Sequence, residues 1–364
     1  MNRYELLAGE LRKRLHEIPE SSMNEIKTRE LLISFITENT GLEICDEGKW
    51  FYAACRSDGA PDGNSKSIAF RADFDAVTCE DGACRHLCGH DGHAAVLAAF
   101  AVWVWENKPP QDIFLIFQPG EESGKGAALC CGIFGKESID EIYGFHNIPG
   151  KPIGSILLKP GTFACASVGL AITLTGAPAH AAYPEFGINP ARAAADIIIC
   201  ISEEIRKPRR GMVLSTVIGI EMGSDHYGVS ASEGILRLTV RAEYQDEYEE
   251  LLGFIEQRVS DISVKTGLEY RIERFDAFPS TENHDRCLRK VEKAASAVGL
   301  PVINLQQPFR WSEDFGWYLK KVPGAFFGIG AGEKWPELHT ADYEFNDEII
   351  GSALAALMSI STSS

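Results

Sequence analysis

Short apolar segments that alternate with helical patterns constrain the fold of this chain more than any other feature. Three of them lie in the first half, at 67–74, 112–117 and 141–145, and each leads into a polar or glycine-containing turn. A fourth, at 324–329, is followed by a predicted helix at 347–360. This alternation predicts a mostly parallel sheet covered by helices. We therefore expect an α/β domain built from both ends of the chain, at 1–166 and 277–364.

The middle of the chain, at 167–276, has a different pattern. It predicts strands at 168–175, 212–221, 235–243 and 268–275, with helices at 189–206 and 246–265. The resulting order, βαββαβ, is that of a ferredoxin-like domain, which forms an antiparallel sheet with two helices on one face. The other face or a sheet edge is then able to pair with a second copy.

Composition excludes several classes of partner. Asp and Glu outnumber Lys and Arg by 52 to 35, and the densest basic cluster is only 206–210, so nucleic acid is not expected. The N-terminus is charged, and the longest apolar run, at 94–105, is too short to cross a bilayer. Ten irregularly spaced cysteines fit reduced thiols, so we expect a cytoplasmic protein without a membrane partner.

The densest group of chemically active residues is CRHLCGHDGH, which places Cys88, His90 and His93 before or on the first turn of a helix. A cysteine and a histidine two residues apart on a loop can both reach one metal ion. The alternative is a helix N-terminus capped by Asp91 with buried histidines beside it. Both interpretations are open at this point.

A second group follows the apolar segment at 112–117, where Glu121 and Glu122 are adjacent. Two neighbouring carboxylates at the end of a buried strand repel each other unless a cation lies between them. One could bind a metal while the other accepts a proton from water. A solvated turn is the alternative.

Three more candidates lie where predicted strands end or in the loops that follow, namely Asp73, His146 and His339. In open parallel sheets, ligands bind beyond the carboxyl ends of the strands. These positions therefore indicate one shared site. His180 lies instead in the ferredoxin-like region, where it is either functional or simply exposed.

The chain resembles the M20 metallopeptidase family, in the branch of aminoacylase-like, hippurate and indole-acetyl-amino-acid hydrolases. The resemblance extends over nearly the whole chain and rests on LHEIPESSMNEIKT, IAFRADFDAV, CGHDGH, QPGEES, YGFHN, GAPAHAAYPEFGINP, WSEDF and LHTADYEF. It implies a di-metal hydrolase domain of mostly parallel sheet, with an inserted ferredoxin-like domain that acts as a lid and dimerisation domain.

The resemblance also assigns roles. Glu121 corresponds to the catalytic carboxylate, Asp73 to a carboxylate that orients the site, and His180 to a lid histidine that reaches the neighbouring subunit's active site. Zinc or manganese fits the ligand set best, and nickel or cobalt also fits. The family's ligands for the two divalent ions fall on Cys88, His90, Glu122, His146 and His339.

Three departures from the family pattern affect the expected pocket. The loop at 77–85 is short, the sequence before Cys88 is RHLC where Met-His-Ala-Cys is more usual, and the segment around His226 lacks an asparagine often placed near the substrate carboxylate. Arg241 is the remaining candidate for that carboxylate, with a surface ion pair as the alternative.

The expected reaction is hydrolysis of an N-acyl amino acid, a related small amide or a dipeptide, by a homodimer. Two alternatives stay open. Cys88 could be a metal-free nucleophile activated by a neighbouring histidine, or the chain could be a non-catalytic relative that only binds metal or peptide.

Overall fold

The computed structural model describes residues 2–57 and 66–363, which divide into two compact units. Unit 1 comprises Met1–Phe163, Thr281–Pro308 and Asp314–Ser364, and unit 2 comprises Ala164–Ser280 and Phe309–Glu313. The short segment 309–313, expected in the first domain, packs with unit 2 because the Cys165 amide donates to the carbonyls of Phe309 and Trp311.

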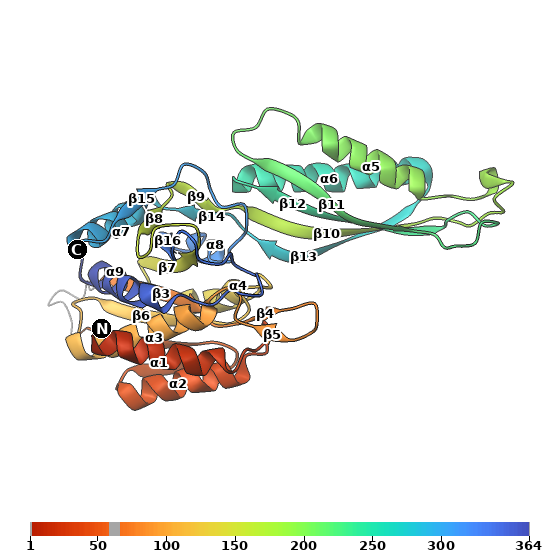
Figure 1. Ribbon diagram of the computed structural model, residues 1–364. Coiled ribbons are helices and arrows are strands. Elements are labelled where there is room, and N and C mark those ends of the chain that lie inside the picture. Colours follow the sequence, from red (N-terminus) through yellow and green to blue (C-terminus); the bar gives the residue numbers. More distant parts are fainter. Residues whose placement is uncertain (1, 58–65, 364) are drawn as a thin grey trace. The chain divides into compact units, whose positions relative to one another are not determined.

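Unit 1 is organised around an eight-stranded sheet in the order β1-β2-β6-β3-β7-β16-β8-β15 (Figure 1). The pairs β3 with β6, β3 with β7, β7 with β16 and β8 with β15 are parallel, whereas β1, β2 and the β8–β16 contact are antiparallel. The predicted mostly parallel α/β sheet is therefore confirmed. Its strands are β1 (Glu43–Asp46), β2 (Phe51–Cys55), β3 (Ser67–Asp73), β6 (Asp112–Gln118), β7 (Glu141–Ile148), β8 (Ile156–Leu158), β15 (Val302–Asn304) and β16 (Gly324–Gly330).

One helix of unit 1 is buried on nearly every side. In α3 (His90–Asn107), every residue from His90 to Val104 except Trp103 is buried. Such burial requires neighbours all round, which here are the sheet strand β3 and the helices α1, α2 and α9. The unit also contains α1 (Arg3–His16), α2 (Ile26–Asn39), α4 (Gly126–Cys130), η1 (Cys131–Gly135), α7 (Asp285–Ala297), α8 (Gly316–Leu319), η3 (Asp347–Ile349) and α9 (Ile350–Thr362).

Two small two-stranded sheets complete the description of this part of the chain. The short loop noted in the sequence forms an antiparallel pair of β4 (Val77–Thr78) and β5 (Cys84–Arg85). A second two-stranded sheet joins β9 (Gly161–Ala164) to β14 (Thr281–Asn283). Across residues 2–57 and 66–363, no helix combines the length and the apolar character that crossing a membrane requires.

Unit 2 has the βαββαβ order and antiparallel pairing that the sequence predicts. Its sheet order is β11-β12-β10-β13, and α5 and α6 lie on the same face (Figure 1). Along β10, buried Val168, Leu170, Ile172 and Leu174 alternate with more exposed residues and form the core. The elements are β10 (Ala166–Thr175), η2 (Pro184–Phe186), α5 (Ala191–Glu204), β11 (Val213–Met222), β12 (Glu233–Ala242), α6 (Gln245–Thr266) and β13 (Glu269–Phe278).

Candidate metal centre

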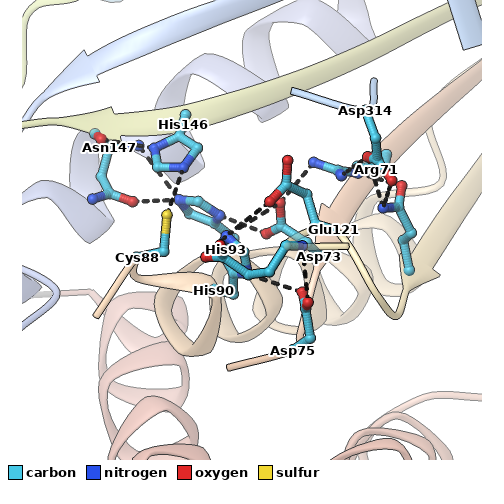
Figure 2. Close-up of polar contacts among 12 residues, drawn as sticks. Arg71, Asp73, Asp75, Cys88, His90, His93, Glu121, His146, Asn147 and Asp314 are labelled. Carbon is cyan, nitrogen blue, oxygen red and sulfur yellow. Dashed lines mark hydrogen bonds and ion pairs between the residues drawn. The ribbon is translucent and has the colours of Figure 1, made fainter. Parts of the chain in front are cut away.

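The carboxyl ends of three neighbouring strands of unit 1 bring most of the predicted site together (Figure 2). Asp73 is the last residue of β3, Glu121 follows β6, and His146 lies near the end of β7. His146 was expected just after its strand, but β7 continues through it to Ile148. The remaining ligand candidates come from the turn before α3, its first residue, the loop after β6 and the loop after β16, namely Cys88, His90, Glu122 and His339.

The candidate ligands form overlapping groups. Cys88, His90 and His146 offer ligand atoms that all lie within 4.8 Å of one another, and Cys88, Glu122 and His339 do the same. Within them, Cys88 Sγ is 3.4 Å from His146 Nε2, and His339 Nε2 is 3.3 Å from Glu122 Oε1. Ligands of one tetrahedral zinc ion are roughly 3.4 Å apart. Cys88 belongs to both groups, so these five side chains together would hold the divalent ions.

His90 provides the test of whether a cation fits. Its Nε2 atom is buried and has no hydrogen-bond partner among the described residues. It lies 3.8 Å from Asp73 Oδ2, 3.8 Å from Glu121 Oε2 and 3.9 Å from Glu122 Oε1. A buried, unpartnered nitrogen beside three acidic oxygens is costly without a cation, so the donor set fits a divalent ion.

Burial and nearby charges shift the pKa values of these groups. Burial opposes protonation of His90, but the charges of Asp73 and Cys88 and the hydrogen bond to Asp75 hold its pKa well above the usual value. Hydrogen bonds to Cys88 and Glu122 raise the pKa of His339 to about 10. Negative groups therefore surround both histidines, and a cation would balance them.

The pKa values of Cys88 and His146 are also shifted, and the shift of Cys88 bears on the alternative of a metal-free nucleophile. Burial raises the pKa of the Cys88 thiol, and burial together with the nearby His93 lowers the pKa of His146 well below its ordinary value. A thiol with a raised pKa is a poor nucleophile unless a cation stabilises its thiolate. This environment favours a metal ligand over the metal-free cysteine nucleophile.

Two buried carboxylates fix the histidines of α3. Asp75 Oδ1 lies 3.0 Å from His90 Nδ1, which leaves His90 Nε2 for the centre. Asp73 Oδ1 lies 2.6 Å from His93 Nδ1, and Asn147 Oδ1 lies 2.5 Å from His93 Nε2. Both nitrogens of His93 are therefore engaged, and Asp73 orients this histidine. Asp75 and Asn147 were not assigned from the sequence, although the RADFD and FHN motifs contain them.

Behind Asp73 lies a buried polar network that the sequence analysis also missed. Arg71 donates to Asp73 Oδ2 and to Asp314 Oδ1, both at 2.7 Å, and to Gln118 Oε1 at 2.7 Å. Burial favours a protonated Asp73, but the charges of Arg71, His90 and His93 lower its pKa well below the usual range. Asp73 is thus held as a carboxylate.

Two backbone conformations position the ligands. Gly89, between Cys88 and His90, has φ +94°, and a Cβ there would lie 2.7 Å from Asn147 Oδ1. Only glycine fits that turn. His339 also has a positive φ, of +64°, and its amide donates to the Leu87 carbonyl at 2.7 Å. A left-handed conformation at a non-glycine residue is costly, and it persists where neighbouring contacts hold it.

The remaining two candidates lie in unit 2. His180 is exposed, in the loop after β10, and its Nδ1 accepts from the Ala182 amide at 3.0 Å. Arg241 is half-buried and donates to the Arg310 carbonyl at 2.9 Å and the Ser312 hydroxyl at 3.1 Å. Arg241 has no carboxylate partner in the described part of the chain, so the surface ion pair considered above is not what the structure contains.

Comparisons with known proteins agree over nearly the whole chain. The model of peptidase family M20/M25/M40 matches residues 69–362. The N-acetyldiaminopimelate deacetylase of Lacticaseibacillus casei (strain BL23) is 28% identical to this chain, and the match covers 96% of this chain and 95% of the relative. That of Shouchella clausii (strain KSM-K16) is 29% identical, and the match covers 94% of each chain. The crystal structure of Bacillus subtilis YXEP protein, described as a dinuclear metal binding peptidase from the M20 family, is 23% identical with a TM-score of 0.82 and covers 99% of this chain and 97% of its own.

The family match spans most of the sequence and includes every ligand candidate described above. The chain therefore belongs to peptidase family M20/M25/M40 and is a metal-dependent amide hydrolase of that family.

Proposed function

We propose that this protein hydrolyses N-acyl amino acids or related small amides, dipeptides included, to a carboxylate and an amine. The single observation that carries the proposal is the buried His90 Nε2, unpartnered among the described residues and facing three carboxylates at 3.8 to 3.9 Å. We assign two divalent ions to the ligands Cys88, His90, Glu122, His146 and His339.

Zinc or manganese suits this set best, because thiolate and imidazole favour zinc while carboxylates also accept manganese; nickel and cobalt fit as well. When bound, the ions supply a more acidic water and positive charge beside the amide carbonyl. Side chains of the protein are proposed to transfer the proton and to stabilise the negative charge on the carbonyl oxygen.

Glu121 is the proposed general base. Glu121 is 6% exposed, and its Oε2 lies 3.8 Å from the unpartnered nitrogen of His90, at the edge of the ligand group. From there its carboxylate accepts a proton from the attacking water as the new carbon–oxygen bond forms. It then delivers that proton to the amine nitrogen as the carbon–nitrogen bond breaks.

We assign His180 to the support of negative charge on the carbonyl oxygen, in the active site of a neighbouring subunit. A homodimer paired through unit 2 is supported by its sheet, because β11 is an edge strand with exposed Val217, Ile218 and Ile220. The role of unit 2 as a lid and dimerisation domain is part of this proposal.

The substrate is proposed to carry a carboxylate next to the amide. Two relatives are N-acetyldiaminopimelate deacetylases, which favours a small acyl group on an amino acid here as well. Arg241 is the proposed contact for the substrate carboxylate, because its guanidinium is half-buried and has no acidic partner among the described residues.

All ten cysteines are free, which supports a cytoplasmic location.

The test is turnover of a substrate panel by protein loaded separately with zinc, manganese, nickel or cobalt. N-acetyl amino acids, N-benzoyl amino acids and dipeptides are compared by release of free amine. We expect N-acetyl or other N-acyl amino acids to be cleaved by at least one metal form. A protein that holds two ions but cleaves no member of the panel would instead be the non-catalytic relative.

A further inference from the structure

The segment just before α2 contacts the loop that carries Glu121 and Glu122. Glu25 is 5% exposed, and its Oε1 accepts hydrogen bonds from the Gly120 amide at 2.7 Å and the Met23 amide at 2.8 Å. A buried side-chain oxygen that accepts two backbone amides holds those amides in place, because a buried amide left without an acceptor costs free energy. Glu25 thus ties the residue before Glu121 to the start of α2.

The amide on the other side of Glu121 is held in the same way. Glu122 N donates to Asp75 Oδ2 at 3.0 Å, and the Ser22 hydroxyl donates to the same oxygen at 2.5 Å. Residues 22–25, which we name the clasp, therefore act on both sides of Glu121, directly through Glu25 and indirectly through Ser22 and Asp75.

Side-chain packing adds to these hydrogen bonds. Met23 has φ +68°, an unusual conformation for methionine, and its side chain rests against Gly120. A Cβ on Gly120, which has φ +62°, would lie only 2.4 Å from Met23 Sδ. Glycine adopts this positive φ without strain, and its missing Cβ lets the loop lie against the Met23 side chain.

We propose that Glu25 is a positioning residue for Glu121. With both flanking amides fixed, the Cα of Glu121 has one position and its carboxylate starts from one direction. A general base needs such placement, since a displacement of about 1 Å can cost on the order of 10²-fold in rate. The inference rests on the proposed role of Glu121, but the hold on the loop can be measured without substrate.

The first measurement is amide hydrogen exchange over residues 119–126 of the metal-loaded full chain. Glu25→Ala removes the acceptor of the Gly120 amide, so exchange at Gly120 should rise by at least about tenfold. Glu25→Gln keeps an acceptor oxygen at the same distance and should stay close to wild type. Glu25→Asp draws the acceptor back by one methylene but keeps the charge, so its exchange rate at Gly120 should lie between those of the other two variants. It is the decisive variant if Glu25→Ala does not fold.

Glu20→Ala is the matched control. Glu20 Oε2 accepts from the Thr28 amide and hydroxyl, both at 2.9 Å, so it stabilises the same start of α2 without touching the Gly120 loop. This variant should lower the melting temperature while leaving exchange at Gly120 unchanged.

The second measurement is turnover of the best N-acyl amino acid of the panel. Glu25→Ala should lower kcat by about 10-fold to 10²-fold with KM and the two bound metals unchanged, Glu25→Gln should recover most of that loss, and Glu20→Ala should keep wild-type kcat. Unchanged exchange at Gly120 in Glu25→Ala, or faster exchange with wild-type kcat, overturns the proposal. If the wild type cleaves nothing while exchange responds as expected, the proposed function fails and the hold on the loop stands.

Discussion

The candidate centre of unit 1 and the candidate side chains of unit 2 differ in how firmly they are held. His90 is 1% exposed, with one ring nitrogen on Asp75 and the other directed at three carboxylates. His180 is exposed, and its Nδ1 contacts only the backbone of its own loop. The first environment is complete within one chain. The proposed role of His180 can be tested only when a substrate and a second subunit are present.

This difference bears on the proposed division of roles between the two units. Metal binding and proton transfer need fixed geometry, which unit 1 provides through buried pairs such as Asp75 with His90. A side chain that supports a developing charge from outside has to arrive with a moving or neighbouring element. The predictions below test whether the two regions divide the work in this way.

Removal of the metals should have the largest effect. Exhaustive dialysis against a chelator should reduce amide hydrolysis to background and lower the melting temperature of unit 1, because its facing carboxylates lose their counter-charge. Ligand binding at a thousandfold excess over Kd contributes about 4 kcal/mol of stability. Activity assays and differential scanning calorimetry, before and after adding zinc or manganese back, measure both effects. Retained activity would revive Cys88 as a metal-free nucleophile.

Glu121→Gln should remove proton transfer while preserving the ligand group. We expect kcat to fall by about 10² to 10⁴-fold, the range of a general base, with two metals still bound. Metal analysis and steady-state kinetics on one sample decide this. A loss smaller than about tenfold would take the base role away from Glu121.

His180→Ala tests the other side of the comparison. It should leave metal content unchanged yet lower kcat by about 10² to 10³-fold, as loss of an oxyanion donor does. Mixing this variant with Glu121→Gln should restore part of the activity, because a heterodimer can contain one site with both residues intact. Activity that remains absent after subunit exchange, checked with differently tagged chains, would argue against a shared site.

The sequence predicted the two regions unequally well. In unit 2 the predicted strands lie within three residues of the observed bounds of β10, β11, β12 and β13. Three strands near the two ends of the unit 1 sheet were not predicted, since β8 and β15 have three residues each and β2 is buried throughout without alternation. Short or uniformly buried strands carry little periodic signal.

For the site, the sequence identified side chains that could bind metal but not the partners that orient them. Cys88, His90 and Glu122 stand in recognisable motifs, and the structure brings them into overlapping groups. The pairing of Arg71 with Asp314 joins residues 243 positions apart and depends on how the strands are ordered. Such long-range partners have no local pattern, so only the folded chain reveals them.

Asp75→Asn should weaken the centre without destroying it. Loss of the charged partner of His90 should lower metal affinity by about 10 to 100-fold, the usual cost of disturbing a residue that orients a ligand. Asp81→Asn is the matched control, because Asp81 is an exposed carboxylate that pairs with Arg85 in the β4–β5 hairpin. Competition with a chromogenic chelator compares both variants. Equal affinities would show that Asp75 does not set the orientation of His90.

Arg241→Met should have the smallest effect and tests unit 2 as a substrate-binding region. If its guanidinium contacts the substrate carboxylate, KM for an N-acetyl amino acid should rise by about tenfold with little change in kcat, and the corresponding amino-acid amide should lose this sensitivity. Arg237→Met is the control, because Arg237 lies on the same strand, β12, and pairs with Glu221. A wild-type KM for the N-acetyl amino acid in Arg241→Met, or an equal rise in KM for the acid and the amide, would assign Arg241 to holding the 309–313 segment, through the Arg310 carbonyl and Ser312 hydroxyl, rather than to recognition.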